Sequence, residues 1–143
     1  MGFYFKKLDP QVNLPAYATY GAAGMDICSN EDMVLDPAIR AAVKTGISYE
    51  IPSGWQLEVR PRSGLALKHG VTVLNAPGTL DSDYTGEIKI ILINHGPSPY
   101  TIVKGDRIAQ LVLTGVNRLT FQEKTDELTP TERGAGGFGS SGK

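Results

Sequence analysis

Cysteine is almost absent from this sequence, since Cys28 is the single one among 143 residues. A lone cysteine excludes an internal disulfide and a thiolate metal cluster, and it fits a reducing compartment. An excess of charge of one sign is also missing, because 14 basic and 15 acidic residues leave a net charge of −1. This balance excludes a large positive field able to hold a polyanion, so no nucleic-acid partner is expected.

Long apolar runs are lacking as well. No stretch is long enough to cross a bilayer, and the segment Met1–Pro15 carries Lys6, Lys7 and Asp9 where a secretory signal would have its apolar core. We therefore expect a cytoplasmic protein with no membrane partner. A small anion is still a possible ligand, because a few Arg, Lys and backbone N–H groups can hold a phosphate locally.

The apolar residues that are present predict an all-β fold of one compact domain. They come in short runs rich in Val, Ile and Tyr, separated by Gly, Pro, Asn and Asp, which is typical of strands joined by tight turns. One short helical turn is expected at Gly64–Lys68. The predicted strands are Phe3–Leu8, Met25–Ser29, Ala41–Ile51, Trp55–Arg60, Val71–Leu74, Glu87–Asn94, Tyr100–Val103 and Arg107–Thr114. This number of short strands favours a barrel or jelly roll.

The glycine-rich end of the chain, Arg133–Gly142, contains a formal G-x-G-x-x-G match from Gly134 to Gly139. It is not a dinucleotide fingerprint, because no helix follows it, and no Gly-Lys-Ser/Thr completes a Walker A loop. Its glycines could still bring backbone N–H groups to a phosphate, with Arg133 as a charged fork and Phe138 as a flat face for a base. Composition alone favours a disordered polar tail.

Two further segments carry candidate chemistry. Pro61–Ala66 follows a strand and opens the helical turn, so Arg62, Ser63 and Gly64 could hold a phosphate, although Ser63 fits an ordinary N-cap equally well. Asn75–Glu87 reads as a β-hairpin with an acidic return. Its backbone could read a pyrimidine edge while a carboxylate activates water, but Asp81 and Asp83 are more often simple turn formers.

The segments around Gln110 and Asp26 raise two questions about polar residues in apolar strands. Strand alternation would place Ile108 on the face opposite Arg107 and Ala109, and Gln110 could be either a core amide or a phosphate donor. Asp26 lies early in an apolar strand, where a carboxylate needs an arginine partner.

Taken together and in this order, five segments resemble the five motifs of the trimeric dUTP pyrophosphatases, or dUTPases. They are AGMDICS, PRSGLALK, the Asn75–Glu87 segment, GDRIAQL and RGAGGFGSSG, and they span Gly24–Gly142. The resemblance implies a jelly-roll-like, distorted β-barrel over residues 1–132 and a flexible lid over residues 133–143. It also implies a C-terminal arm exchanged between the subunits of a homotrimer whose active sites are shared. The implied reaction converts dUTP and water to dUMP and pyrophosphate, which lowers dUTP and supplies dUMP for thymidylate synthesis.

The same resemblance assigns a role to individual residues. Asp81 corresponds to the general base that activates the attacking water, and Asp83 to a different family acid. Tyr84 corresponds to a tyrosine packed under the deoxyribose, which leaves no room for a ribose 2′-hydroxyl. Asp26 corresponds to a supporting acid that orients arginine or metal-bound water. The uracil- and sugar-reading positions are Asn75, Gly78, Thr79, Leu80 and Lys89, and the phosphate-chain positions are Arg62, Ser63, Gly64 and Gln110. In the tail, Arg133 matches a γ-phosphate contact, Phe138 the ring that stacks on uracil, and Gly139 and Ser140 nearby donors.

Mg²⁺ is the implied cofactor, held by the substrate phosphates and water and not by a direct protein ligand. The sequence departs from the family pattern at Ala135, where a Ser or Thr hydroxyl is common, and at Thr79, where an aliphatic residue is common. Two alternatives share the fold: a dCTP deaminase, and a nucleotide-binding regulator that has lost the chemistry. The aromatic tail and the Asn75–Tyr84 segment favour uracil as the base, and the presence of Asp81, Arg62, Gln110 and Arg133 argues against a silent regulator.

Overall fold

The computed structural model describes residues 2–139 and has the predicted all-β, jelly-roll-like architecture, with twelve strands and one helix in that range. The largest sheet has five strands in the spatial order β2 (Ala16–Tyr17), β3 (Met25–Cys28), β12 (Arg107–Gly115), β7 (Trp55–Arg60) and β9 (Gly78–Leu80). A three-stranded sheet contains β5 (Arg40–Lys44), β10 (Lys89–Asn94) and β8 (Val71–Val73). The two remaining pairs are β1 (Tyr4–Lys7) with β6 (Ile47–Glu50), and β4 (Met33–Leu35) with β11 (Tyr100–Ile102).

The hydrophobic core lies between the two larger sheets. Alternate residues of the strands point inward, as the period of two of a β-strand requires. The five-stranded sheet contributes Ile27, Leu57, Val59 and Leu111, and the three-stranded sheet contributes Val43, Val71, Val73, Ile90 and Leu92, all of them buried. The other face of the five-stranded sheet does not pack against the core, so its strands can carry polar residues there. The predicted phosphate-binding side chains lie on this face and at the edge of the sheet.

Strand β12 departs from the alternation that the sequence predicted. Its pairing with β3 shifts register between Arg107 and Ala109, which is a β-bulge. Ile108 and Ala109 are consequently both buried, with 1% and 0% of their surface exposed, so the expectation that they face opposite sides of the strand is wrong. A bulge turns one extra residue inward and re-aims the side chains around it. Arg107 is thereby separated from the regular part of β12.

The predicted strand Ala41–Ile51 is two strands, β5 and β6, because the chain turns at Gly46. Gly46 has a φ of +68°, a conformation that favours glycine, and a Cβ there would lie 2.7 Å from Nδ2 of Asn30. β5 then pairs with β10, and β6 pairs with β1. The strands β2, β4 and β9, each of two or three residues, were not predicted from the sequence.

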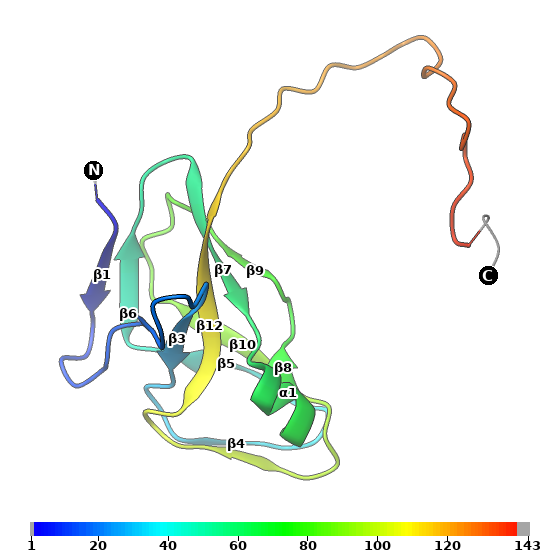
Figure 1. Cartoon of the computed structure of the whole chain (residues 1–143). Coiled ribbons are helices and arrows are strands. Elements are labelled where there is room, and N and C mark those ends of the chain that lie inside the picture. The colour runs from blue at the N-terminus through cyan, green and yellow to red at the C-terminus, as the bar shows by residue number, and fades with distance from the viewer. Residues whose placement is uncertain (1, 140–143) are drawn as a thin grey trace.

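The helix α1 (Ser63–His69) is slightly longer than predicted and lies beside β8 at one end of the barrel (Figure 1). It ends at Gly70, which has a left-handed φ of 70° and whose N–H donates to the carbonyl of Ala66. After Gly115 the chain leaves the barrel and runs outward as an extended arm (Figure 1). No helix within residues 2–139 is long and apolar enough to cross a membrane.

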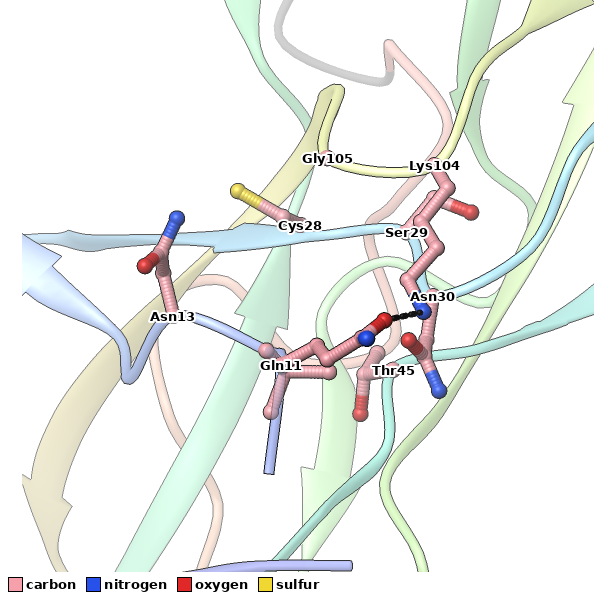
Figure 2. A pocket seen from close by; sticks show the side chains of 9 residues that line it. Gln11, Asn13, Cys28, Ser29, Asn30, Thr45, Lys104 and Gly105 are labelled. Atoms are coloured by element: carbon pink, nitrogen blue, oxygen red, sulfur yellow. Dashed lines mark hydrogen bonds between the residues drawn. The ribbon is translucent and has the colours of Figure 1, made fainter. Parts of the chain in front are cut away.

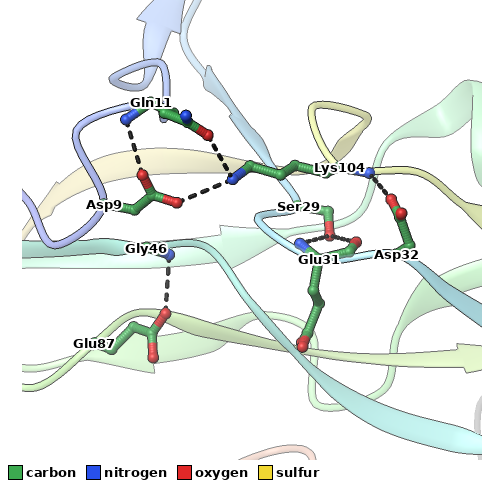
Figure 3. Close-up of polar contacts among 8 residues, drawn as sticks. All are labelled: Asp9, Gln11, Ser29, Glu31, Asp32, Gly46, Glu87 and Lys104. Carbon is green, nitrogen blue, oxygen red and sulfur yellow. Dashed lines mark hydrogen bonds and ion pairs between the residues drawn. The ribbon is translucent and has the colours of Figure 1, made fainter.

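Polar contacts fasten the N-terminal segment to the loop before β12 (Figure 3). Nζ of Lys104 lies 3.0 Å from Oδ2 of Asp9 and 3.4 Å from Oε1 of Gln11. The backbone N–H of Lys104 donates to Oδ1 of Asp32. Lys104 therefore connects three segments that are far apart in the sequence.

Candidate active site

The predicted phosphate-binding residues gather where β3, β12 and β7 run side by side. Gln110 of β12 lies between its two antiparallel partners, Asp26 on β3 and Arg60 on β7. β7 ends at Arg60, and Pro61 then leads into the first turn of α1, which carries Ser63 and Gly64. Adjacent strand positions thus bring together five residues that the sequence places in three separate segments: Asp26, Arg62, Ser63, Gly64 and Gln110.

Asp26 holds two arginine side chains at once. Its Oδ1 lies 3.2 Å from Nε of Arg62, and its Oδ2 lies 3.1 Å from Nη1 of Arg107. The expected arginine partner of Asp26 is confirmed. The carboxylate is three-quarters buried, with 25% of the side chain exposed, so its contact with the similarly buried Arg62 is screened less by solvent than a surface ion pair. The Arg62 guanidinium is fixed further, because Nη1 donates to the carbonyl of Arg107 at 2.9 Å.

Arg107 was not singled out from the sequence. In the sequence it stood out only as the arginine of the GDRIAQL segment. Simple strand alternation set the face on which it was expected, and alternation does not include the bulge that the structure shows. The structure shows 57% of its side chain exposed while one end holds Asp26. Two guanidinium groups anchored on one carboxylate make a local positive patch on a chain with nearly balanced charge.

Gln110 and Ser63 occupy positions that refine the sequence prediction. Nε2 of Gln110 donates to the carbonyl of Pro61 at 2.9 Å, and since an amide nitrogen carries two hydrogens, the bond leaves one for a ligand. Ser63 is the first residue of α1 and not its N-cap. The N-cap is Arg62, which has extended backbone angles and makes no side-chain capping hydrogen bond. The N-cap alternative for Ser63 is therefore wrong.

The segment Asn75–Glu87 is not the simple hairpin predicted from the sequence. β8 and β10 pair with each other, but between them the chain crosses to the other sheet, where β9 pairs with β7. Gly78 is buried in that crossing, and a Cβ there would lie 3.2 Å from both Nδ2 of Asn75 and Cβ of Val59. Asn75, Thr79 and Lys89 are exposed near this crossing, and Leu80 is half-buried.

Asp81 follows β9 and begins an exposed loop. It lines a cavity of about 200 Å³ together with Asp83, Trp55 and Arg118. The Asp81 carbonyl accepts a hydrogen bond of 2.6 Å from the hydroxyl of Tyr49, and Tyr84 donates its own hydroxyl to the carbonyl of Glu87 at 2.9 Å. The carboxylate that the sequence resemblance assigns as a base is therefore accessible, while its backbone carbonyl is held by the hydrogen bond from Tyr49.

The structure does not bring Asp81 to the phosphate cluster within one chain. Leu80 pairs with Leu57 on β7, and Arg60 lies three residues farther along the same strand. Asp81 continues in the opposite direction, so at about 3.3 Å per residue its backbone is roughly 13 Å from that of Arg60, with Arg62 beyond it. The proposed base and the proposed phosphate contacts thus occupy opposite ends of β7.

The predicted lid residues are separate from both groups, on the extended arm (Figure 1). Nε of Arg133 donates to the carbonyl of Gly136 at 2.7 Å, which closes a local turn. Gly134 and Gly139 have positive φ values, and Phe138 is fully exposed. The candidate donor Ser140 lies outside the described residues.

None of the predicted site residues lines a second cavity. It measures about 230 Å³ and is lined by side chains that include Gln11, Cys28, Asn30, Thr45 and Lys104 (Figure 2). Burial and the negative charge of Asp26 raise the pKa of the Cys28 thiol, so this cysteine is a poor nucleophile at neutral pH. The candidate active site is therefore assigned to the two groups at the ends of β7.

The class of fold is shared with solved nucleotide-hydrolysing β-barrels. A dUTPase mutant of Staphylococcus bacteriophage 80alpha, solved with dUpNHpp, superposes with a TM-score of 0.88 at 26% identity, and 99% of each chain is covered. The dUTPase family model matches residues 11–142. A deoxyuridine 5′-triphosphate nucleotidohydrolase of Nautilia profundicola is 52% identical over all of both chains. One of Chlamydia pneumoniae is 56% identical over 96% of this chain and 97% of its own. The chain belongs to the dUTPase family.

Proposed function

We propose that this chain hydrolyses dUTP to dUMP and pyrophosphate, with Asp81 as the general base. The observation that carries the proposal is the cluster in which Asp26 anchors Arg62 and Arg107 beside Gln110 and the start of α1. Such a set of fixed donors fits a polyphosphate chain. Membership of the dUTPase family supports the reaction, and the exposure of Asp81 is compatible with its proposed role as the base.

The proposed step is an in-line displacement at the α-phosphorus. The Asp81 carboxylate accepts a proton from water as the water oxygen bonds to phosphorus, and the bond to the oxygen bridging the α- and β-phosphates breaks. The electron pair of that bond leaves with pyrophosphate. Arg62, Ser63, Gly64 and Gln110 hold the phosphate chain so that the leaving group is aligned, with Ser63 near the bond that breaks.

Uracil and deoxyribose are assigned to the crossing between the two sheets. Asn75 and the backbone of Gly78–Asp81 present donors and acceptors to the base, and Lys89 lies on the return strand. Because this reading uses the backbone, Thr79 in place of an aliphatic residue changes little. The ring of Tyr84 packs under the deoxyribose and excludes a 2′-hydroxyl.

Mg²⁺ fits this site as an ion carried by the substrate. Within residues 2–139 no three His, Cys, Asp or Glu side chains converge on a point that could hold a metal. Asp26, the carboxylate nearest the phosphate contacts, is already paired with two arginines. The triphosphate and water are the hard oxygen ligands that Mg²⁺ prefers, and the bound ion neutralises phosphate charge and fixes one conformation.

We also propose that the active sites are shared within a homotrimer. Asp81 and Ser63 must both reach the same α-phosphorus, yet the register of β7 places them at opposite ends of that strand. A second copy that supplies one of the two groups removes this conflict. The arm carries the exposed apolar side chains Leu119, Phe121 and Leu128 away from its own barrel. Packing of the arm against a neighbouring copy would bury these side chains.

The lid proposal assigns residues 133–143 to a third role in the same site. Arg133 contacts the γ-phosphate and Phe138 stacks on uracil, with Gly139 and Ser140 as nearby donors. Ala135 lacks the hydroxyl that is common in the family, so one contact to phosphate is missing. The arm supports this role, because it stands clear of its own barrel and can close over another copy's nucleotide. The boundary at residue 132 and a cytoplasmic location stay predictions.

The function is tested by measuring pyrophosphate release with Mg²⁺ from dUTP, dTTP, dCTP and UTP. We expect rapid release from dUTP and at least about 100-fold less from the others, because backbone reading of uracil and exclusion of the 2′-hydroxyl act together. Ammonia release from dCTP without pyrophosphate from dUTP would replace the proposal by a dCTP deaminase. Binding of dUTP without turnover would replace it by a silent regulator.

A further inference from the structure

Tyr49 is the one buried tyrosine that contacts the loop carrying Asp81. It lies on β6, where it pairs with Phe5 of β1, and only 4% of its surface is exposed. Its hydroxyl nevertheless reaches a polar partner, the carbonyl of Asp81, at 2.6 Å. The two residues are 32 positions apart, so this bond joins the β1–β6 pair to the start of the loop.

The Tyr49 hydroxyl is a permanent donor. Burial, followed by the charge of Asp81, raises the pKa of Tyr49 far above the physiological range. The phenol therefore stays protonated and can only donate to a carbonyl. A buried hydroxyl that lost this partner would be unsatisfied, which makes the contact costly to break.

The ring of Tyr49 contacts the other residue that the proposed reaction needs from this loop. The centroids of Tyr49 and Tyr84 are 6.3 Å apart and their planes are inclined by 40°. This separation is within the range of attractive aromatic pairs. Tyr84 is otherwise 44% exposed, and its hydroxyl bonds only within the loop, to Glu87. Tyr49 is thus its link to the buried part of the barrel.

The far end of the loop is fastened to the same strand region. The N–H of Ile88 donates to the carbonyl of Ile47 at 2.8 Å, and Thr45 donates its hydroxyl to the carbonyl of Ile88 at 2.7 Å. The N–H of Gly46 donates to a carboxylate oxygen of Glu87 at 2.9 Å (Figure 3). Residues 45–49 therefore hold the loop at both ends, and Tyr49 provides the contact at the end where Asp81 lies.

We infer that Tyr49 is a positioning residue for the hydrolysis: its hydroxyl fixes the peptide of Asp81, and its ring supports Tyr84. The inference rests on the proposed roles of those two residues. Rotation of the Asp81 peptide would move its carboxylate relative to the attacking water, and displacements of about 1 Å are enough to slow a reaction strongly. Loss of the ring beneath Tyr84 would loosen the contact that excludes a ribose 2′-hydroxyl.

The hydroxyl and the ring are tested by two substitutions at one position. Tyr49→Phe keeps the ring and removes the hydrogen bond, so kcat for dUTP should fall about 3- to 10-fold while KM stays within about 2-fold. Tyr49→Leu also removes the ring, so turnover of UTP relative to dUTP should rise about 5-fold or more above the Tyr49→Phe value. Thermal unfolding of each variant is followed in parallel.

Tyr20→Phe is the matched control. Tyr20 is fully exposed and lies outside both the Asp81 loop and the phosphate cluster. Its kinetics should match those of the unchanged protein. A kcat of Tyr49→Phe equal to that of the unchanged protein would overturn the inference, as would an equal fall in Tyr20→Phe, which would show that the loss of any tyrosine hydroxyl has the same effect. Asp81→Asn, assayed alongside, tests the proposed function separately: if it turns over normally, the role of Asp81 fails, and the inference fails with it.

Discussion

Asp26 is the residue on which the arrangement of the phosphate cluster depends. Its two carboxylate oxygens hold two different guanidinium groups, those of Arg62 and Arg107. Without the carboxylate, two like charges would remain close together, with only the bond of Arg62 to the Arg107 carbonyl to orient them. The role of Asp26 is therefore to orient cations, and it is exerted through them and not by contact with the base of the nucleotide.

Asp26→Asn should lower kcat/KM for dUTP about 10-fold or more, because one or both arginines lose a charge-assisted hydrogen bond that orients them. Inhibition by deoxyuridine should be unchanged, since deoxyuridine has no phosphate. Steady-state kinetics and the inhibition constant check both parts. Asp36→Asn, which removes the same charge from an exposed loop, is the control. A value of kcat/KM within about 2-fold of normal in Asp26→Asn would contradict the assignment.

The sequence points to candidate site residues most directly where the proposed chemistry lies within one short segment. Arg62, Ser63 and Gly64 are adjacent, and Asp26 in an apolar strand requires a cation on physical grounds alone. Tyr49 could not be found in this way. It has the appearance of a core residue, and its importance comes from contacts with residues more than 30 positions away.

At the scale of strands and turns, the structure differs from the prediction where pairing between distant segments decides the conformation. The bulge in β12 depends on the register with β3, and β9 is a strand only because β7 offers it an edge. The apolar periodicity of a short stretch of sequence can predict neither the bulge nor the pairing of β9 with β7. Trp55–Arg60, a strand with strong apolar alternation, was predicted with correct bounds.

The turn between α1 and β8 depends on Gly70. It has a φ of 70°, and a Cβ there would lie 2.5 Å from the backbone N of Gly96. Gly70→Ala should therefore lower the free energy of unfolding by about 2 kcal/mol or more, from the unfavourable left-handed backbone and from the collision. Urea denaturation measures the change.

Gly21→Ala is the control for that measurement. No heavy atom lies within 4 Å of a Cβ at Gly21, and its φ is not positive. Its free energy of unfolding should change by no more than about 0.5 kcal/mol. Equal denaturation midpoints for the two variants would show that Gly70 does not constrain the turn.

At the scale of the whole molecule, the proposed parts of the active site lie apart within one chain. The loop that carries the proposed base, the proposed phosphate cluster and the arm occupy three separate regions. The sequence resemblance implies a trimer, and the separation along β7 gives a physical reason for one. No pattern within a single sequence could have located the groups relative to each other, since their distance follows from strand register.

Shared sites are tested most directly by mixing two variants that are each defective in a different part. Asp81→Asn and Arg62→Gln, assayed alone for pyrophosphate release from dUTP, should each lose most turnover, by roughly 100-fold or more. After unfolding and refolding together in equal amounts, mixed trimers contain sites with an intact Asp81 from one chain and an intact Arg62 from another. The mixture should then recover about a quarter of normal activity. Recovery no greater than the average of the two variants would show that each chain builds its site alone, and normal turnover by Asp81→Asn would remove that residue as the base.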